Sequence, residues 1–193
     1  MRAEWGAGDE ALVFGTVGAY VDHKDPLNLV AAWRLARERT TPELKSARLV
    51  FVGEGDQRSA METAIAAAGM RDSVTLTGWR QDVGDCLAAM DVFVMPSKLE
   101  GLCTSLIDAQ AVGLACVATA AGGIPDVITD GVNGLLAPPR NANALADRLI
   151  QVATDAALRK RLASAGPRIA EEKFSVQRMV EGNLAVYRRV ADL

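Results

Sequence analysis

Residues 92–118 read VFVMPSKLEGLCTSLIDAQAVGLACVA, and this stretch decides the fold. It begins with the apolar run Val92–Met95, passes through a loop, and continues as residues 105–112, whose apolar side chains recur at helical spacing. A second apolar run, Ala115–Ala118, follows Gly113. Continuous apolar runs are typical of parallel strands covered on both faces. The stretch therefore predicts a strand, a crossover helix and a parallel strand.

The same alternation extends towards the N-terminus. Further strands are predicted at residues 11–17, 47–52 and 73–76, and further helices at residues 25–39, 56–68 and 83–90. From Asn141 onward helical spacing is almost continuous, with interruptions at Gly166-Pro167 and at Ser175, a typical N-cap residue. The pattern predicts one α/β domain over residues 1–193: a Rossmann-like, doubly wound parallel sheet with a helical C-terminal layer. Residues 1–10 are expected to form a loose lead-in, as a linker would.

Composition excludes several classes of function. The chain has 193 residues and a net charge of -3, so it lacks the basic excess that nucleic-acid binding requires. Its three cysteines form no CxxC pair and it has one histidine, so we expect neither a metal site nor a disulfide framework. The first residues do not resemble a signal peptide, and no uncharged run has the roughly 20 apolar residues of a membrane span. A cytoplasmic protein is expected.

Glycine lies at or near the exit of every predicted strand, including Gly18 and Gly78. Tight turns between strands and helices explain some of these glycines. In an open parallel sheet, however, the ligand crevice also lies at the carboxyl ends of the strands. The residues that follow the strands are therefore the candidates for a binding site.

Two acids lie near the exit of the fourth predicted strand. Glu100 is in the loop and Asp108 is eight residues later, inside an otherwise apolar helix. Burial of an unpaired carboxylate costs several kcal/mol, so a ligand hydroxyl is one explanation for the pair. The alternative is that Asp108 complements the positive end of its helix, which is worth about 0.3–1 kcal/mol. That alternative leaves Glu100 unexplained.

An anion site is predicted between these acids. The segment Gly101, Leu102, Cys103, Thr104, Ser105 runs from the loop into a helix start, where backbone N–H groups and the helix dipole favour negative charge. Lys24, after the first strand, could supply a positive charge to the same phosphate, or could be a solvated lysine. Together these parts suit a nucleotide diphosphate that carries a sugar.

The stretch PSKLEGLCTSLIDAQAVGLACVATAAGGIPDVITDGVNGLLAPPRNANALADRL closely resembles the C-terminal, donor-binding half of retaining glycosyltransferases of the two-Rossmann-domain type, called GT-B, in the group-1 or family-four set. The resemblance continues through VFGTVGAYVDHKDPLNLVAAW, LVFVGEG, VTLTGW and FSVQRMVEGNLAVYRRV, and so covers nearly the whole chain. It implies one half of a GT-B fold and a hexosyltransferase activity with a nucleotide diphosphate sugar as donor and with no metal or other cofactor.

The resemblance also implies roles for individual residues. Glu100 matches the acid that contacts the donor sugar, and Asp108 matches the acid that contacts the ribose. Lys24 matches the lysine that holds the diphosphate, together with the amides of Cys103, Thr104 and Ser105. Lys24 and Glu100 are thus the expected catalytic residues. Gly78-Trp79-Arg80 matches the segment that lies along the nucleobase.

The chain departs from the family pattern at three points. Asp108 is one methylene shorter than the usual glutamate, and Ala19 occupies a position where members commonly carry an arginine. The N-terminal, acceptor-binding domain is absent from this chain. The chain alone is therefore expected to bind donor without transferring the sugar, and any membrane contact would belong to the absent half. The alternative in a different class is a non-catalytic subunit that binds nucleotide sugars.

Two further hypotheses rest on single motifs. Gly53-Glu54-Gly55 follows a strand as in dinucleotide oxidoreductases, but Arg58 replaces the third glycine of that fingerprint. Cys103 precedes a helix start, which would lower the pKa of a nucleophilic thiol, with His23 as a possible base. Neither hypothesis explains the acid pair.

The absence of a DxD pair argues against glycosyltransferases that neutralise the diphosphate with a divalent metal.

Overall fold

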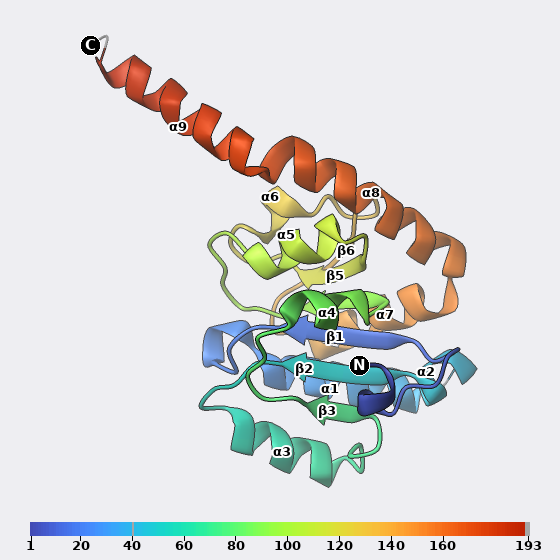
Figure 1. Ribbon diagram of the computed structural model, residues 1–193. Helices are drawn as coiled ribbons and strands as arrows, with labels where there is room; N and C mark the ends of the chain where they lie inside the picture. Colours follow the sequence, from blue (N-terminus) through green and yellow to red (C-terminus); the bar gives the residue numbers. More distant parts are fainter. Residues whose placement is uncertain (40, 192–193) are drawn as a thin grey trace.

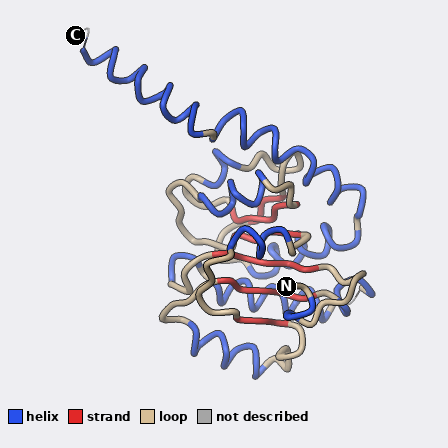
Figure 2. The backbone as a smooth tube through the Cα atoms, in the orientation of Figure 1, coloured by secondary structure: helices blue, strands red, loops and turns tan. Residues whose placement is uncertain are grey.

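A computed structural model describes residues 1–39 and 41–191, and it contains a six-stranded parallel sheet. The strand order is β3-β2-β1-β4-β5-β6 (Figures 1 and 2). The strands are β1 Val13–Val17, β2 Arg48–Val52, β3 Val74–Leu76, β4 Val92–Met95, β5 Ala115–Thr119 and β6 Leu135–Ala137. The five predicted strands are confirmed. β6 was not predicted.

Helices connect the strands and cover both faces of the sheet (Figure 1). They are η1 Ala3–Trp5, η2 Asp22–Lys24, α1 Pro26–Glu38, α2 Pro42–Ser46, α3 Arg58–Ala67, α4 Val83–Ala88, α5 Thr104–Ala111, α6 Ile124–Val127, α7 Ala142–Thr154, α8 Ala156–Phe174 and α9 Val176–Ala191. The long helices match the predicted ones, whereas α2 and α6 are single turns without periodicity. Across residues 1–39 and 41–191, none of the helices has both the length and the apolar character needed to cross a membrane.

Two hydrophobic cores explain why the strands are largely apolar on both faces. Phe14, Leu49 and Phe51 point to one face, where they pack with residues of α1, α3 and α7. Val50 and Phe93 point to the opposite face, where they pack with residues of α4, α5 and α6. Alternate strand residues thus enter different cores, and neither face of the sheet is left to water.

The N-terminal segment is packed against the domain, which corrects the expectation of a loose lead-in over residues 1–10. Trp5 is 2 % exposed and belongs to the core on the α5 face. The Arg2 guanidinium donates to the Asp91 carboxylate at 3.0 Å and to the Ala89 carbonyl at 3.0 Å. The sequence did not predict the burial of Trp5, because a single tryptophan in a polar segment shows no hydrophobic periodicity.

The predicted interruption at Gly166-Pro167 is wrong, since α8 continues through both residues. Gly166 is buried against α5, where an added Cβ would lie 2.8 Å from the carbonyl oxygen of Gln110. Packing along α5 thus keeps the helix continuous despite the missing proline N–H, because tertiary contacts can override local propensity. The predicted break at Ser175 is confirmed: its hydroxyl accepts from the Arg178 N–H at 3.4 Å, and α9 begins at Val176.

Removal of residues 176–193 is expected to leave the melting temperature nearly unchanged. The helix α9 extends away from the rest of the domain (Figure 1), and none of its described residues is buried. Its loss should cost about 1 kcal/mol or less, which corresponds to roughly 2–4 °C in a domain of this size. Thermal unfolding of the two chains checks this. A much larger decrease would mean that α9 packs on the domain in solution.

Candidate functional site

The strand order reverses direction between β1 and β4, which places the expected ligand crevice at their carboxyl ends. From β1 the chain adds β2 and β3 on one side, and β4 then pairs with the opposite edge of β1. The connections that leave β1 and β4 therefore go to opposite faces and open a crevice between them. Two loops border it: the first-strand loop, residues 18–25, and the fourth-strand loop, residues 96–103.

The structure brings Lys24 and Glu100 together across this crevice. Lys24 ends the short helix η2 in the first-strand loop, and its Nζ donates to Glu100 Oε1 at 2.7 Å. The side chain of Glu100 is 6 % exposed, whereas that of Lys24 is 26 % exposed. These two residues are 76 positions apart in the sequence, so only the parallel pairing of β1 with β4 makes them neighbours.

Glu100 is held by a chain of hydrogen bonds that leads back to the sheet. The Ser97 hydroxyl donates to Glu100 Oε1 at 2.5 Å, and the Thr119 hydroxyl at the end of β5 donates to the Ser97 carbonyl at 2.6 Å. The N–H of Gly123 donates to the Glu100 carbonyl at 3.0 Å. Side chain and backbone of Glu100 are thus both held by hydrogen bonds.

The pair Gly122-Gly123 allows the close approach of β5 and the fourth-strand loop. Gly122 has a φ of +53°, and a Cβ on it would lie 2.0 Å from the Glu100 carbonyl oxygen. A Cβ on Gly123 would lie 2.1 Å from the carbonyl oxygen of Gly101. The sequence pattern placed these glycines at a strand exit but assigned them no role. Their contact with Glu100 shows that they position it.

The start of α5 forms the end of the fourth-strand loop, as predicted, but only part of its backbone is available to an anion. The Thr104 N–H already donates to the Leu102 carbonyl at 3.1 Å, which corrects the expectation for that amide. Cys103 is the N-cap and makes no side-chain cap bond. The N–H groups of Cys103 and Ser105 donate to no backbone carbonyl among the residues that the structure describes.

Asp108 lies in a more exposed environment than Glu100. It is exposed on α5 and lines a groove of about 350 Å³ with Leu102, Thr104 and residues of the α8–α9 junction such as Phe174. Because it is exposed, the expected cost of burying its carboxylate does not arise. It also lies beyond the first turn of α5, which contains no acidic residue. A ribose contact for Asp108 stays a prediction.

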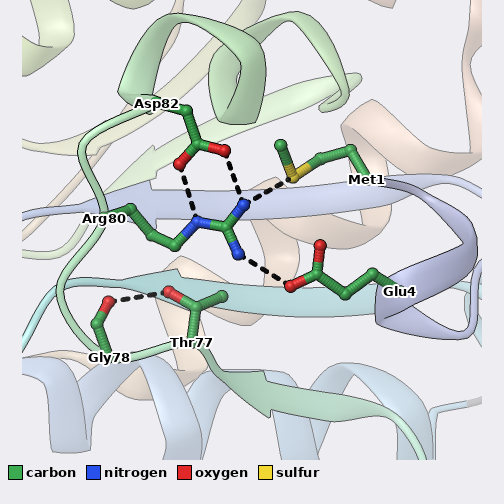
Figure 3. Close-up of polar contacts among 6 residues, drawn as sticks. All are labelled: Met1, Glu4, Thr77, Gly78, Arg80 and Asp82. Carbon is green, nitrogen blue, oxygen red and sulfur yellow. Dashed lines mark hydrogen bonds and ion pairs between the residues drawn. The ribbon is translucent and has the colours of Figure 1, made fainter.

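Figure 3 shows that the side chain of Arg80 is used within the protein. Its guanidinium bonds both oxygens of Asp82, at 2.7 and 2.6 Å, and Glu4 Oε1 at 2.7 Å. These bonds attach the loop after β3 to the N-terminal segment, and Glu4 is close in sequence to the buried Trp5. Trp79 is 71 % exposed. Of the predicted nucleobase segment, Trp79 thus carries the exposed side chain, whereas the Gly78 carbonyl accepts from the Gly53 N–H and the Thr77 hydroxyl.

Gly18 lies at the exit of β1 and lines a small cavity with Lys24, Tyr20 and Pro96. The glycines of the Gly53-Glu54-Gly55 motif face the same loop. A Cβ on Gly53 would lie 2.0 Å from the Gly18 carbonyl oxygen, and one on Gly55 would lie 2.5 Å from that of Tyr20. The glycines of this motif therefore allow two loops to pack closely, and they face protein backbone. In a dinucleotide-binding fingerprint the corresponding glycines face the pyrophosphate.

The thiol of Cys103 does not suit nucleophilic catalysis. Cys103 is 2 % exposed, and burial, with the nearby Glu100 carboxylate, raises the pKa of its thiol to about 11. The helix start does not lower it, which corrects the hypothesis that motivated this residue. Within residues 1–39 and 41–191, no group of three His, Cys, Asp or Glu side chains is placed to hold a metal ion.

Alkylation of Cys103 in the folded chain is expected to be at least roughly tenfold slower at pH 8 than in urea, because the reactive thiolate is scarce below the raised pKa. The rate should rise as the pH approaches 11. Peptide mass spectrometry after timed exposure to iodoacetamide measures both. Rapid modification of the folded chain at pH 7 would favour a reactive thiolate instead.

Comparisons with known proteins identify relatives and solved structures with the same fold. LpsE of Rhizobium meliloti, a lipopolysaccharide core biosynthesis glycosyltransferase, is 30 % identical over 183 residues, which is 95 % of this chain and 52 % of LpsE. The structure of Anabaena HepE in complex with UDP-glucose is 25 % identical, with a TM-score of 0.84 over 100 % of this chain and 51 % of HepE. The C-terminal domain of LpcC from Francisella tularensis, a group 1 family protein, has the same fold: 23 % identity and a TM-score of 0.79, over 91 % of this chain and 93 % of that domain.

The fold and the crevice define one half of a GT-B glycosyltransferase. Residues 1–169 match the family described as "Glycosyl transferases group 1", and the chain belongs to that family. The chain spans about half the length of LpsE and of HepE.

Proposed function

We propose that this chain is the donor-binding half of a retaining glycosyltransferase, which transfers a sugar from a nucleotide diphosphate sugar to an acceptor. The observation that carries the proposal is the contact of Lys24 with Glu100, at 2.7 Å, where the strand order reverses. A cation and a carboxylate meet there in the crevice where this class of sheet binds ligands. The UDP-glucose held by HepE, whose fold is similar, supports a sugar nucleotide as the ligand.

Each group has a distinct part in donor binding. Lys24 exchanges its bond to Glu100 for one to the diphosphate, and the amides of Cys103 and Ser105 at the start of α5 share that charge. Glu100 then accepts hydrogen bonds from sugar hydroxyls, still held by Ser97. During transfer Lys24 stabilises the charge that develops on the leaving diphosphate. No metal is needed for these steps, so EDTA should leave donor binding unchanged.

Transfer requires a closed cleft that excludes water and presents the acceptor hydroxyl to the anomeric carbon. We assign the acceptor to the half that LpsE and HepE have beyond the matched region. The exposed Ala19, at the family's arginine position, leaves Lys24 as the cation of the first-strand loop that faces Glu100. The isolated chain should therefore bind donor and transfer no sugar.

Binding of sugar nucleotides to the chain tests the proposal. UDP-glucose, GDP-mannose and ADP-glucose, with the corresponding free diphosphates, are compared by calorimetry and thermal unfolding. A ligand that binds only the folded state increases the free energy of unfolding, by about 2.7 kcal/mol when its free concentration is a hundred times Kd. The melting temperature rises accordingly. We expect one nucleotide series to bind. If none of the six binds, the proposal is wrong.

Two variants separate the predicted roles. Lys24→Met should weaken the free diphosphate and the sugar nucleotide alike by roughly tenfold or more, or about 1.4 kcal/mol. Glu100→Gln should keep the free diphosphate and lose the preference for its sugar conjugate. Lys160→Met, an exposed lysine on α8, is the matched control and should bind as the wild type does. Wild-type affinities in both site variants would contradict the assignment.

A further inference from the structure

A second lysine, Lys98, links the two loops that border the crevice. It lies in the fourth-strand loop, two residues before Glu100. Its N–H donates to the His23 carbonyl at 2.8 Å, and its Nζ donates to Asp22 Oδ1 at 2.7 Å. Nζ also lies 3.6 Å from Asp25 Oδ1. The three partners of Lys98 are thus the residues immediately around Lys24.

The environment of this clasp, formed by Lys98, Asp22 and Asp25, makes it firmer than an ordinary surface ion pair. The Lys98 side chain is 21 % exposed and that of Asp25 is 10 % exposed, whereas that of Asp22 is 78 % exposed. Asp25 has a left-handed backbone, with a φ of +50°, and directly precedes α1. Burial raises the pKa of Asp25, and Lys98 acts against that shift. Lys98 thus neutralises a carboxylate that is mostly removed from water.

The clasp keeps the two loops joined during donor binding. In the proposed function, the Lys24–Glu100 ion pair must open, since Lys24 moves to the diphosphate and Glu100 to the sugar. With that pair open, the bonds from the Lys98 amide and ammonium group still join the two loops. The clasp therefore keeps the spacing of the loops when the bond between Lys24 and Glu100 is exchanged for bonds to the ligand.

We propose that Lys98 is a positioning residue, which through Asp22 and Asp25 sets the distance between Lys24 and Glu100 to suit a ligand that contacts both. Lys98 itself touches no ligand. This inference rests on the proposed function. Its distinctive consequence is selectivity: a ligand that spans both loops depends on the clasp more than one that contacts Lys24 alone.

Lys98→Met tests the inference, with the sugar nucleotide that the wild type binds and its free diphosphate as probes. Affinity for the sugar nucleotide should fall roughly tenfold, which is about 1.4 kcal/mol, and affinity for the free diphosphate should fall much less. Lys98→Arg keeps a cation within reach of both aspartates and should restore most of the loss. Lys160→Met is the control, because it removes an exposed lysine charge elsewhere.

A second variant tests the inference if Lys98→Met is unstable. If Lys98→Met lowers the melting temperature by many degrees, Asp22→Asn removes only the exposed partner and should reduce the same affinity ratio in the same direction. An unchanged ratio of sugar nucleotide to diphosphate affinity in Lys98→Met, or in Asp22→Asn where the first variant is unstable, overturns the inference. If the wild type binds no sugar nucleotide, the proposed function has failed as well.

Discussion

Trp5→Ala is expected to lower the free energy of unfolding by about 3–5 kcal/mol, the usual cost of removing a large aromatic side chain from a core. Trp5 is 2 % exposed and packs with Val13 and Val50 in the core on the α5 face. For a chain of this length the melting temperature should fall by roughly 6–20 °C. Thermal and urea unfolding measure the change.

Trp79→Ala is the matched control for this variant, because Trp79 is 71 % exposed. It should change the free energy of unfolding by about 0.5 kcal/mol or less, as surface substitutions usually do. Equal melting temperatures for Trp5→Ala and the wild type would mean that residues 1–7 are detached from the domain. That result would restore the interpretation of this segment as a lead-in.

Gly122→Ala is expected to damage both stability and the site. The φ of +53° costs an alanine about 1–2 kcal/mol, and its Cβ would lie 2.0 Å from the Glu100 carbonyl oxygen. Relief of that overlap costs about 1–3 kcal/mol more and moves Glu100. The preference for a sugar nucleotide over its free diphosphate should therefore be lost, as measured by calorimetry.

Gly131→Ala isolates the effect of the overlap from that of backbone strain. Gly131 has a similar φ of +72°, but nothing lies within 4 Å of a Cβ added there. This variant should lose about 1–2 kcal/mol and keep its ligand preference. If the two variants bind alike, the contact between Gly122 and Glu100 does not position the carboxylate.

Most of the architecture was predictable from the order of residues. Four of the five predicted strands contribute side chains to both cores, and such apolar runs are typical of a parallel sheet covered on both sides. The predictions fail where an element is too short to show a hydrophobic period, or where tertiary packing outweighs the local propensity of a residue. α6 is too short to show a period, and Pro167 lies inside α8 because α8 packs along α5.

The candidate site divides in the same way. The sequence predicted Lys24, Glu100 and the start of α5 as one site because residues after parallel strands meet at one edge of the sheet. It also placed Asp108 and Arg80 there. In the structure Asp108 is exposed and lines a groove at the α8–α9 junction, and the Arg80 guanidinium joins Asp82 to Glu4. Side-chain direction depends on neighbours distant in sequence, which spacing does not show.

The amino-acid sequence alone thus determined the type of fold, the edge of the sheet that carries the site and the cation and carboxylate that face each other there. These features follow from local hydrophobic period and from the geometry common to all parallel sheets. Only the tertiary structure decided what holds Glu100 in place, how Lys98 joins the two loops and that Trp5 belongs to the core. Those features depend on contacts between segments far apart in the chain, and the physical interactions that select such contacts leave no periodic signal in the order of residues.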